Sequence, residues 1–568
     1  MPRLSFAGPR PEPVLRSWLP VLALLLYTPL AAQDSLPPAD TTSLTAPVDS
    51  TDRLAAPLQV KTDSLGRPIV QYVEVRGSDI FDSSETRNWT QRLMNGLHFR
   101  THLGIIEREV LIHPGEPYDS ARAAETARNL RTLGLFRRVR LDTVRTDSGL
   151  VFRVYAQDGW STQADLRFRS AGKQTDWQVS LIERNLIGTA TLFATRYRHT
   201  PDRSLVNFQL LKRRLIARTV AVGLRYESRS DGKRGSVSID RPFLALSDRR
   251  GISVGFDTRN ERIIQFRDGN SDPSDSTRRR YTIGVIEAAT ALRASNTGYL
   301  RLGLTGQVRR EDYAPWPSKP GPQTVTATAG TFLEWRRANY VVTQGFARIG
   351  RDEDVDVSTF ARLAVIAAPK FLGYDSGGVG LVAQLRVGTQ LPKGFAWVDA
   401  RANGLYGSGG LDSGSVTFGG TAVFAPIPRH KLIAHADIGW IKNPLPAAEF
   451  DLGFATGPRG FPIHAFTGDR NYFTTAEYRF IFGQDLFKAL DLGAAAFVDH
   501  GGAWFHTEAR RTGTDVGLGL RLSPSRAADA NPTRLDLAYR FKNDAQKAGW
   551  VFVVASGLVF STQPRGGS

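Results

Sequence analysis

Short segments in which apolar and polar residues alternate fill the chain from about residue 160 to residue 560. Along residues 535–541 the odd-numbered positions are apolar, whereas the even-numbered positions include Asp536 and Arg540. The same alternation recurs in residues 164–169, 300–305, 381–387 and 515–522. A period of two places successive side chains on opposite faces of a β-strand. Each segment therefore predicts a strand with one apolar face and one polar face.

A closed membrane barrel explains this pattern better than a soluble fold does. In lipid, every backbone polar group needs an internal partner, and closing a sheet into a barrel supplies one. The apolar faces would contact lipid and the polar faces would line a wet lumen. A large soluble β-sandwich or propeller is the alternative. With about 25 residues for each strand and its connection, we expect an all-β transmembrane barrel of about 16 antiparallel strands over residues 159–560. Residues 561–568 would form a C-terminal tail.

The N-terminus has the order of a secretory signal peptide. Three arginines precede the apolar run Trp18–Leu30, and the small residues Ala31 and Ala32 follow it. This order predicts a cleaved signal peptide at residues 1–32, with a retained anchor as the alternative. Residues 33–67 are largely rich in Ser, Thr, Pro and Asp, a composition typical of a flexible linker.

A small α/β unit is predicted between the linker and the barrel, at residues 68–158. Residues 69–76 alternate like a strand. We expect Thr101 to cap a short helix that runs to Ile112, and Asp119 to cap a second helix that ends at Gly134. A hairpin would follow, with strands at residues 136–144 and 150–157. The expected order is one strand, two helices and two strands.

Composition narrows the function classes. The 568 residues include no cysteine, which excludes disulfides, thiolate metal sites and cysteine nucleophiles. The formal charge of +18 is spread along the chain rather than gathered in a basic arm, so it favours anionic lipid headgroups over nucleic acid. His113, His464 and His500 are isolated, with no nucleophile elbow and no metal-ligand spacing in the sequence. We therefore expect neither an enzyme nor a cofactor or metal site.

One long loop and the strands after it carry the candidate site. Arg459 lies between Pro458 and Gly460, where the chain can turn sharply and project a guanidinium. Asp499 lies within an otherwise apolar strand, and an unpaired buried carboxylate would be costly there. A bidentate pair with Arg459 would remove that cost, with Glu477 as a second acceptor. For each residue taken singly, a solvated charge in the lumen is the favoured interpretation.

Several motifs in order along the chain resemble one family, the outer-membrane assembly factors typified by BamA and TamA, also called bacterial surface antigens. Two-partner secretion transporters are related to them. The motifs in the barrel region are Glu183–Gly188, Asp240–Phe243, Arg459–Gly460–Phe461, Glu477–Phe480, and Phe497 with Asp499 and Gly501. Residues 115–118 and 130–136 resemble one polypeptide-transport-associated (POTRA) domain. The resemblance spans about residues 68 to 560.

The resemblance implies a transport machine without catalysis. The loop of Arg459, Gly460 and Phe461 would fold into the lumen, and barrel-wall residues Asp499, Glu477 and Gly501 would hold it. Substrate strands would add to the edge of the periplasmic sheet and pass to a weak barrel seam. That seam would join residues 162–169, including Arg167, to the last strand, which contains Phe552, Gly557 and Phe560. Arg167 and Leu558 serve as a provisional pair across it.

The implied partners are unfolded outer-membrane or secreted polypeptides, outer-membrane lipids and periplasmic accessory subunits. The location would be the bacterial outer membrane, with the small domain in the periplasm. A secretion pore for a dedicated partner and a passive or structural channel are the alternatives. Three features depart from the family pattern: a single periplasmic domain, an insertion at residues 78–99 and a tail after Phe560.

Overall fold

The computed structural model describes residues 61–561 except 87, 148, 172–173, 217–218, 267–273, 319–323, 376, 445–447, 455 and 530. The predicted signal peptide, most of the predicted linker and the predicted tail beyond Ser561 lie outside these residues. No helix within the described ranges is long and apolar enough to cross a membrane.

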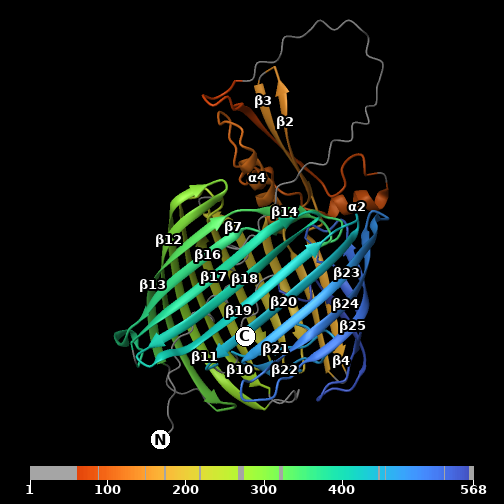
Figure 1. The fold of residues 1–568 in the computed structure, drawn as a ribbon. Helices are drawn as coiled ribbons and strands as arrows, with labels where there is room; N and C mark the ends of the chain where they lie inside the picture. Colours follow the sequence, from red (N-terminus) through yellow and green to blue (C-terminus); the bar gives the residue numbers. More distant parts are fainter. Residues whose placement is uncertain are drawn as a thin grey trace, which may run out of the picture.

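The described residues from Thr162 to Ser556 include twenty strands that form a closed antiparallel barrel (Figure 1). Each strand pairs with its neighbours along the chain, and β27 closes the barrel against β4. The strands are β4 (Thr162–Ala171), β5 (Gln174–Glu183), β6 (Thr191–His199), β7 (Ser204–Ile216), β8 (Val220–Arg229), β9 (Gly232–Arg241), β10 (Arg250–Gln265), β11 (Asp275–Ser295), β12 (Gly298–Pro315), β13 (Thr324–Arg337), β16 (Thr359–Ala368), β17 (Gly378–Leu391), β18 (Gly394–Gly407), β19 (Gly410–Phe424), β20 (His430–Lys442), β23 (Arg470–Leu486), β24 (Leu490–Trp504), β25 (Gly513–Pro524), β26 (Thr533–Arg540) and β27 (Gly549–Ser556).

The expected number of about 16 strands is wrong, because many hairpin connections are very short. Strand β11 ends at Ser295 and β12 begins at Gly298, while β17 ends at Leu391 and β18 begins at Gly394. A strand with its connection therefore takes fewer than the assumed residues, and the same length of chain makes twenty described strands.

The two faces of the wall differ as the alternation predicts. On β12 the side chains of Leu302 and Leu304 are 45% and 63% exposed, whereas Arg301 and Arg309 face the interior and are buried. Exposed Leu, Val, Ile and Phe side chains recur on the outside of nearly every strand. An apolar outer wall around a polar interior is the pattern of a barrel that lies in lipid.

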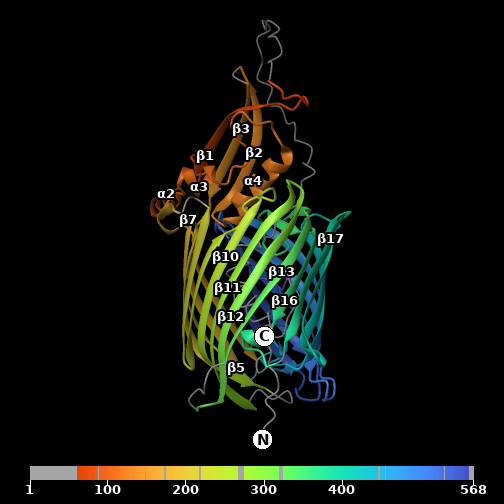
Figure 2. The ribbon, with the colours of Figure 1, turned by 90° about the vertical axis from the view of Figure 1, so that its left-hand side faces the viewer.

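A small α/β domain lies at one end of the barrel (Figures 1 and 2). Its elements are β1 (Val70–Ser78), α2 (Trp89–Leu97), α3 (Leu103–Glu107), α4 (Ser120–Thr132), β2 (Phe136–Thr146) and β3 (Gly149–Asp158). The sheet order is β1–β3–β2, with β1 parallel to β3 and β2 antiparallel to β3. Helix α2 lies in the segment predicted as an insertion, so the described part of the domain has a third helix.

Two of the predicted helix boundaries in this domain hold and two do not. Asp119 caps α4 by accepting from the backbone N–H groups of Ala121 and Arg122, and Gly134 adopts φ +66° just after the helix. The N-cap of α3 is His102 rather than Thr101, and α3 ends at Glu107 rather than Ile112. Thr101 is instead buried, where its N–H donates to Asp158.

Short elements between the barrel strands complete the fold. They are the 3₁₀ turns η1 (Leu186–Gly188) and η2 (Lys370–Leu372), the hairpin β14 (Tyr340–Thr343) with β15 (Glu353–Asp356), and the hairpin β21 (Phe450–Leu452) with β22 (Phe466–Gly468). Residues of both hairpins belong to one apolar cluster with inward-facing residues of the wall. The lumen is therefore partly filled by segments that enter it from both ends.

Candidate functional site: the lumen and the barrel seam

The loop between β21 and β22 brings Arg459 into a buried ionic cluster on the inner wall. The Arg459 guanidinium donates from Nε and Nη2 to the two carboxylate oxygens of Asp499, at 2.7 and 3.1 Å. Its Nη1 lies 3.1 Å from Glu477 and 3.3 Å from Asp536. The guanidinium carbon also lies 3.6 Å from the centre of the Phe497 ring. Arg459 is fully buried, so all of these contacts are shielded from solvent.

The cluster extends along the inner faces of β23, β24, β25 and β26 and contains arginines and acids in alternation. Arg521 bridges Glu477 at 2.9 Å and Asp536 at 2.5 Å, and Arg534 lies 2.9 Å from Asp536. The described residues of the cluster are the arginines Arg459, Arg479, Arg521 and Arg534 and the acids Glu477, Asp499, Asp515 and Asp536. Each of the four arginines lies against at least one carboxylate, which avoids the cost of an unpaired buried cation.

Sequence reasoning brought Arg459 together with Asp499 and Glu477 but missed Asp536 and Arg521. Asp536 was visible as the polar member of an alternating strand, yet nothing local marked it as a partner of a loop more than seventy residues away. Gly501 lies against the backbone of β23, where a Cβ would approach the carbonyl oxygen of Tyr472 to 2.5 Å.

Gly460 and Phe461 fix the loop beside Arg459. The Gly460 N–H donates to Asp515 at 2.8 Å, and a Cβ on Gly460 would lie 2.8 Å from the Asp515 Cβ. Phe461 is fully buried and packs against Phe466, with ring centres 5.1 Å apart. The motif therefore combines a charged contact, a close backbone approach and an apolar anchor.

His464 fastens the same loop to the far end of the barrel. Its Nε2 lies 2.8 Å from Asp202 in the turn between β6 and β7, and its Nδ1 lies 2.6 Å from Asp451. The ring stacks on Phe266 at 3.7 Å. Burial alone would lower the pKa of His464, but the carboxylates of Asp451 and Asp202 outweigh burial and raise it to about 9. His464 looks isolated in the sequence because its partner Asp202 is distant in the chain.

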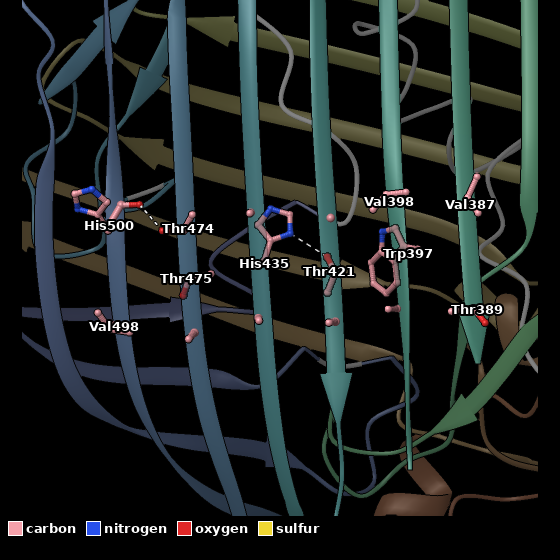
Figure 3. A pocket seen from close by; sticks show the side chains of 16 residues that line it. Val387, Thr389, Trp397, Val398, Thr421, His435, Thr474, Thr475, Val498 and His500 are labelled. Atoms are coloured by element: carbon pink, nitrogen blue, oxygen red, sulfur yellow. Dashed lines mark hydrogen bonds between the residues drawn. The ribbon is translucent and has the colours of Figure 1, made fainter. Parts of the chain in front are cut away.

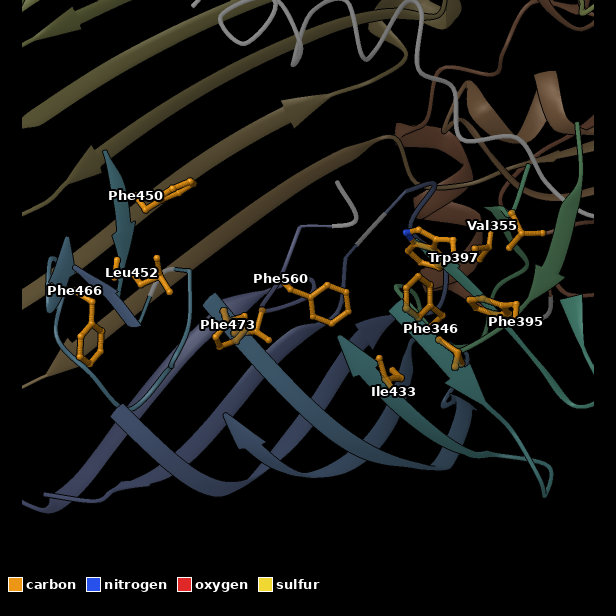
Figure 4. Packing of buried hydrophobic residues seen from close by; sticks show 14 of the residues in the cluster. Phe346, Val355, Phe395, Trp397, Ile433, Phe450, Leu452, Phe466, Phe473 and Phe560 are labelled. Carbon is orange, nitrogen blue, oxygen red and sulfur yellow. The ribbon is translucent and has the colours of Figure 1, made fainter. Parts of the chain in front are cut away.

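The connection between β13 and β16 folds back into the lumen as the hairpin β14–β15 (Figure 4). Phe346, in the turn of this hairpin, meets the inward-facing rings of Phe395 and Trp397 edge-on at 5.5 and 6.0 Å. Arg479 donates to the carbonyl oxygens of Gly345, at 3.5 Å, and Phe346. This hairpin was not expected from the sequence.

The C-terminal segment also turns into the lumen, which corrects the expectation that a last strand runs to Phe560. Strand β27 ends at Ser556, and Gly557 adopts φ +75°, a conformation that favours glycine. Phe560, which points into the lumen in Figure 4, stacks on His435 of the inner wall, with ring centres 4.1 Å apart and planes at 8°. Phe560 is therefore an interior residue, while Phe552 lies on the outer wall and is 49% exposed.

The barrel closes through a short seam between β27 and β4. Among the described residues, three pairs join these strands: Phe552 with Ser170, Val553 with Arg169, and Val554 with Phe168. Eight pairs join β26 to β27, and ten join β4 to β5. The provisional pair of Arg167 and Leu558 is wrong, because the observed register sets Phe168 opposite Val554 and Leu558 lies beyond the end of β27. Arg167 instead lies 3.0 Å from Asp165 on its own strand.

The small domain is docked on the mouth of the barrel by ion pairs and hydrogen bonds (Figure 2). Arg131 of α4 donates from Nη2 and Nε to the two carboxylate oxygens of Asp354 in the β14–β15 hairpin, at 2.5 and 2.7 Å. Arg214 of β7 binds Glu109 in the same manner, at 2.6 and 3.1 Å. Bidentate geometry fixes orientation as well as distance, so the domain has a defined pose on the barrel.

A hollow of about 610 Å³ lies in the wall formed by strands β17 to β20, β23 and β24 (Figure 3). Most of its lining residues are on outward-facing positions, and Val387, Val398 and Val498 at its borders are 42–59% exposed. Its floor consists mainly of Gly, Ala and Thr, and it is almost entirely apolar. It therefore belongs to the outer apolar surface and not to the lumen.

Comparisons with known proteins show likeness in fold at low sequence identity. No family model matches the chain, and no curated protein matches it. CdiB from Escherichia coli is 10% identical with a TM-score of 0.45, and the match covers 98% of this chain and 100% of that chain. BamA from Haemophilus ducreyi lacking POTRA domains 1–3 is 10% identical with a TM-score of 0.39, covering 86% and 85% of the two chains. The siderophore receptor PirA from Acinetobacter baumannii is 8% identical with a TM-score of 0.36, covering 72% and 82%.

These values assign no family, so function has to be argued from the geometry of the chain itself. The relevant features are the buried ionic cluster around Arg459, the β14–β15 hairpin and the C-terminal segment that turn into the lumen, and the seam between β27 and β4. Within the described part of the chain no group of three or more His, Cys, Asp or Glu side chains is arranged to hold a metal ion.

Proposed function

We propose that this protein inserts polypeptides into, or moves them across, a bacterial outer membrane, and that it does so without catalysing a chemical reaction. The observation that carries the proposal is the seam of three residue pairs beside a lumen that is closed by the chain's own segments. A barrel that served only as a stable pore would gain from a fully paired wall and an open lumen.

The energetics favour opening at the seam over any other pair of neighbouring strands in the described barrel. A backbone hydrogen bond contributes a net of about 0.5–1.5 kcal/mol. Three pairs therefore hold β27 to β4 with only a few kcal/mol, about a third of what a joint of ten pairs would provide. An incoming strand would replace the lost bonds with its own, so the backbone groups would not be left unsatisfied in lipid.

The small domain offers a first contact for a substrate strand. Among the described residues β2 pairs with β3 alone, so the other edge of β2 is available for an added strand. Edge addition recognises the main chain of the substrate rather than its sequence. We propose that this domain is POTRA-like and lies in the periplasm, that residues 1–32 direct export, and that the apolar outer wall contacts outer-membrane lipids. Accessory subunits at the domain remain part of this proposal.

A secretion pore for a dedicated partner is the second candidate, and the width of the barrel favours it. Barrels of 16–18 strands enclose an aqueous channel, and the twenty described strands here enclose at least as much space. The segments that fill this space are loops and a hairpin rather than wall side chains, so their movement would open a path. A passive channel is disfavoured, since the same segments obstruct it at rest.

The test is to deplete the protein and quantify the outer-membrane and secreted proteomes together. Broad loss of barrel proteins supports insertion, and loss of one secreted species supports the dedicated pore. An unchanged proteome in both fractions contradicts the proposal. Complementation by the parent chain and by the variant Leu304→Ala provides the control, because Leu304 lies on the outer face of β12, away from the buried cluster and the seam, and is 63% exposed.

A further inference from the structure

The inner wall carries a peptide-shaped site that the chain's own hairpin occupies. We propose that the inner face of β18, β19, β20 and β23 binds a turn of a polypeptide that carries an aromatic side chain, and that the β14–β15 hairpin, with Phe346 in its turn, is a resident mimic of that substrate. The inference rests on the proposed function in taking a polypeptide as the cargo. It adds where the cargo binds and which chemistry selects it.

The apolar half of this site consists of Phe395, Trp397, Val423 and Ile433, all less than 5% exposed. Phe395 and Trp397 stack parallel to each other at 6.1 Å, and Phe346 of the hairpin meets both rings nearly at right angles (Figure 4). Edge-to-face pairs contribute about 0.5–1.5 kcal/mol each beyond the burial of apolar area. The wall therefore offers a slot that fits one aromatic ring.

The polar half of the site recognises the main chain. Arg479 donates to the carbonyl oxygens of Gly345 and Phe346, which belong to the peptide bonds before and after the aromatic residue. Lys431 donates to the hydroxyl of Thr343 at 2.9 Å. Contacts to backbone carbonyls are independent of side-chain identity, so a foreign segment can accept the same bonds. An aromatic slot beside main-chain donors selects a turn of chain that carries a Phe, Tyr or Trp.

The β14–β15 hairpin is held weakly and can be released from the wall. Strands β14 and β15 have four residues each, and among the described residues they pair with each other and not with the barrel sheet. A two-stranded hairpin is at best marginally stable by itself. Its place in the lumen therefore depends on the wall site and on its contacts to the small domain.

Those contacts connect the hairpin to the edge where a substrate would first bind. Arg351, in the hairpin turn, donates to the carbonyl of Phe136, the first residue of β2. Arg131 of α4 binds Asp354, and the guanidinium of Arg128 lies 4.6 Å from the centre of the Tyr340 ring. A strand added to β2 would disturb these contacts and release the hairpin. Arg479 also binds Glu477, so release would reach the Arg459 cluster as well.

The experiment replaces the hairpin and asks whether its site becomes available. Arg337 pairs with Thr359 at the end of β13 and β16, so an Asn-Gly turn can replace residues 338–358 and close this joint. The probe is a fluorescent synthetic peptide with the sequence of residues 338–358, titrated against purified protein in detergent. We expect saturable binding to the turn variant, and binding at least ten-fold weaker to the parent, whose site is filled.

Two further substitutions test the location of the site. In the turn variant, Trp397→Ala should weaken peptide binding at least ten-fold. Val398→Ala should leave it unchanged, because Val398 is the next residue but faces outward and is 59% exposed. A peptide that carries Phe346→Ala should bind as weakly as the native peptide binds to the Trp397→Ala variant. No saturable binding, or equal binding with and without Trp397, overturns the proposal.

A second variant keeps the proposal testable if the turn variant fails to fold. Phe346→Ala in the full chain removes the ring that anchors the resident hairpin while all other residues are retained. This variant should bind the native peptide more tightly than the parent does, and equal affinity contradicts the proposal. Peptide binding does not require transport, so the proposed function and the proposed peptide site can be rejected independently. Unchanged proteomes with intact binding reject the function alone, whereas lost barrel proteins without peptide binding reject the site alone.

Discussion

The contact between Arg459 and Asp499 should determine whether the central loop stays in the lumen. Arg459→Ala removes the five hydrogen bonds of the Arg459 side chain. The backbone N–H of residue 459, which lies 3.2 Å from Asp499, is retained. Asp499 is fully buried, and Thr475 is then its remaining side-chain donor, at 2.6 Å. The variant therefore leaves a buried carboxylate without its cation.

The size of the effect follows from that geometry. Removal of one partner of a buried ion pair costs about 3–5 kcal/mol. The barrel itself does not have to unfold to avoid this cost, because movement of the loop lets water reach Asp499. At about 1.4 kcal/mol for each factor of ten, the equilibrium between the inserted and the released loop should shift toward release by at least about 100-fold.

A thiol placed in the loop can report this shift. The chain contains no cysteine, so Ala465→Cys introduces a single reactive group. Ala465 is 5% exposed in the apolar cluster of the lumen, and a reagent reaches it only when the loop moves. The maleimide labelling rate at neutral pH should rise at least about 100-fold in the Arg459→Ala variant. Arg459→Lys, which retains charge but loses the planar fork, should lie between the two.

Two outcomes would refute this reasoning. A labelling rate within about three-fold of the parent would show that the ionic cluster does not hold the loop, since that ratio is well below 1 kcal/mol. A similar rise after Arg167→Ala would show that loss of any inward arginine has the same effect. In a rescue experiment, Asp499→Asn in the Arg459→Ala background should slow labelling again, because it removes the stranded charge.

Three further predictions address the loop tip, the seam and the C-terminal segment. The pKa of His464 is raised above 6.5, so its ion pairs with Asp202 and Asp451 should be fully formed below about pH 6.5. They should weaken as the pH rises through about 9. A spin label at residue 465 should become mobile over that range in the parent, and should be mobile at neutral pH in His464→Asn. The pair Phe168→Cys and Val554→Cys should form a disulfide across the seam that abolishes insertion until it is reduced, whereas a disulfide between β25 and β26 should have no effect. Gly557→Val should cost about 1–2 kcal/mol through its left-handed backbone and expose the C-terminus to carboxypeptidase, unlike Gly549→Val, which has open space around it.

The pH prediction has a definite size. The difference between 6.5 and about 9 corresponds to about 3 kcal/mol of preference for the charged imidazole in the folded protein. This value is an upper bound, because the side chain of Asp451 is 34% exposed and solvent screens its charge. A label whose mobility is independent of pH in the parent would contradict the role of His464.

The sequence by itself determined the alternating faces of the wall, because a period of two leaves no choice about which side chains point outward. It also determined the cap of α4 at Asp119 and the turn of Arg459 between Pro458 and Gly460, which depend on adjacent residues. The sequence did not determine the number of strands, because the composition of the chain does not distinguish a turn of two residues from a loop of twenty.

Only the tertiary structure decided which distant residues meet. Asp536 joins Arg459, Asp202 joins His464 and Phe560 joins His435 because the closed barrel brings separate strands around one lumen. The β14–β15 hairpin could not be foreseen either, because two strands of four residues are stable only where a wall receives them. Local chemistry fixes faces, caps and turns, whereas long-range contacts depend on closure of the chain into one sheet.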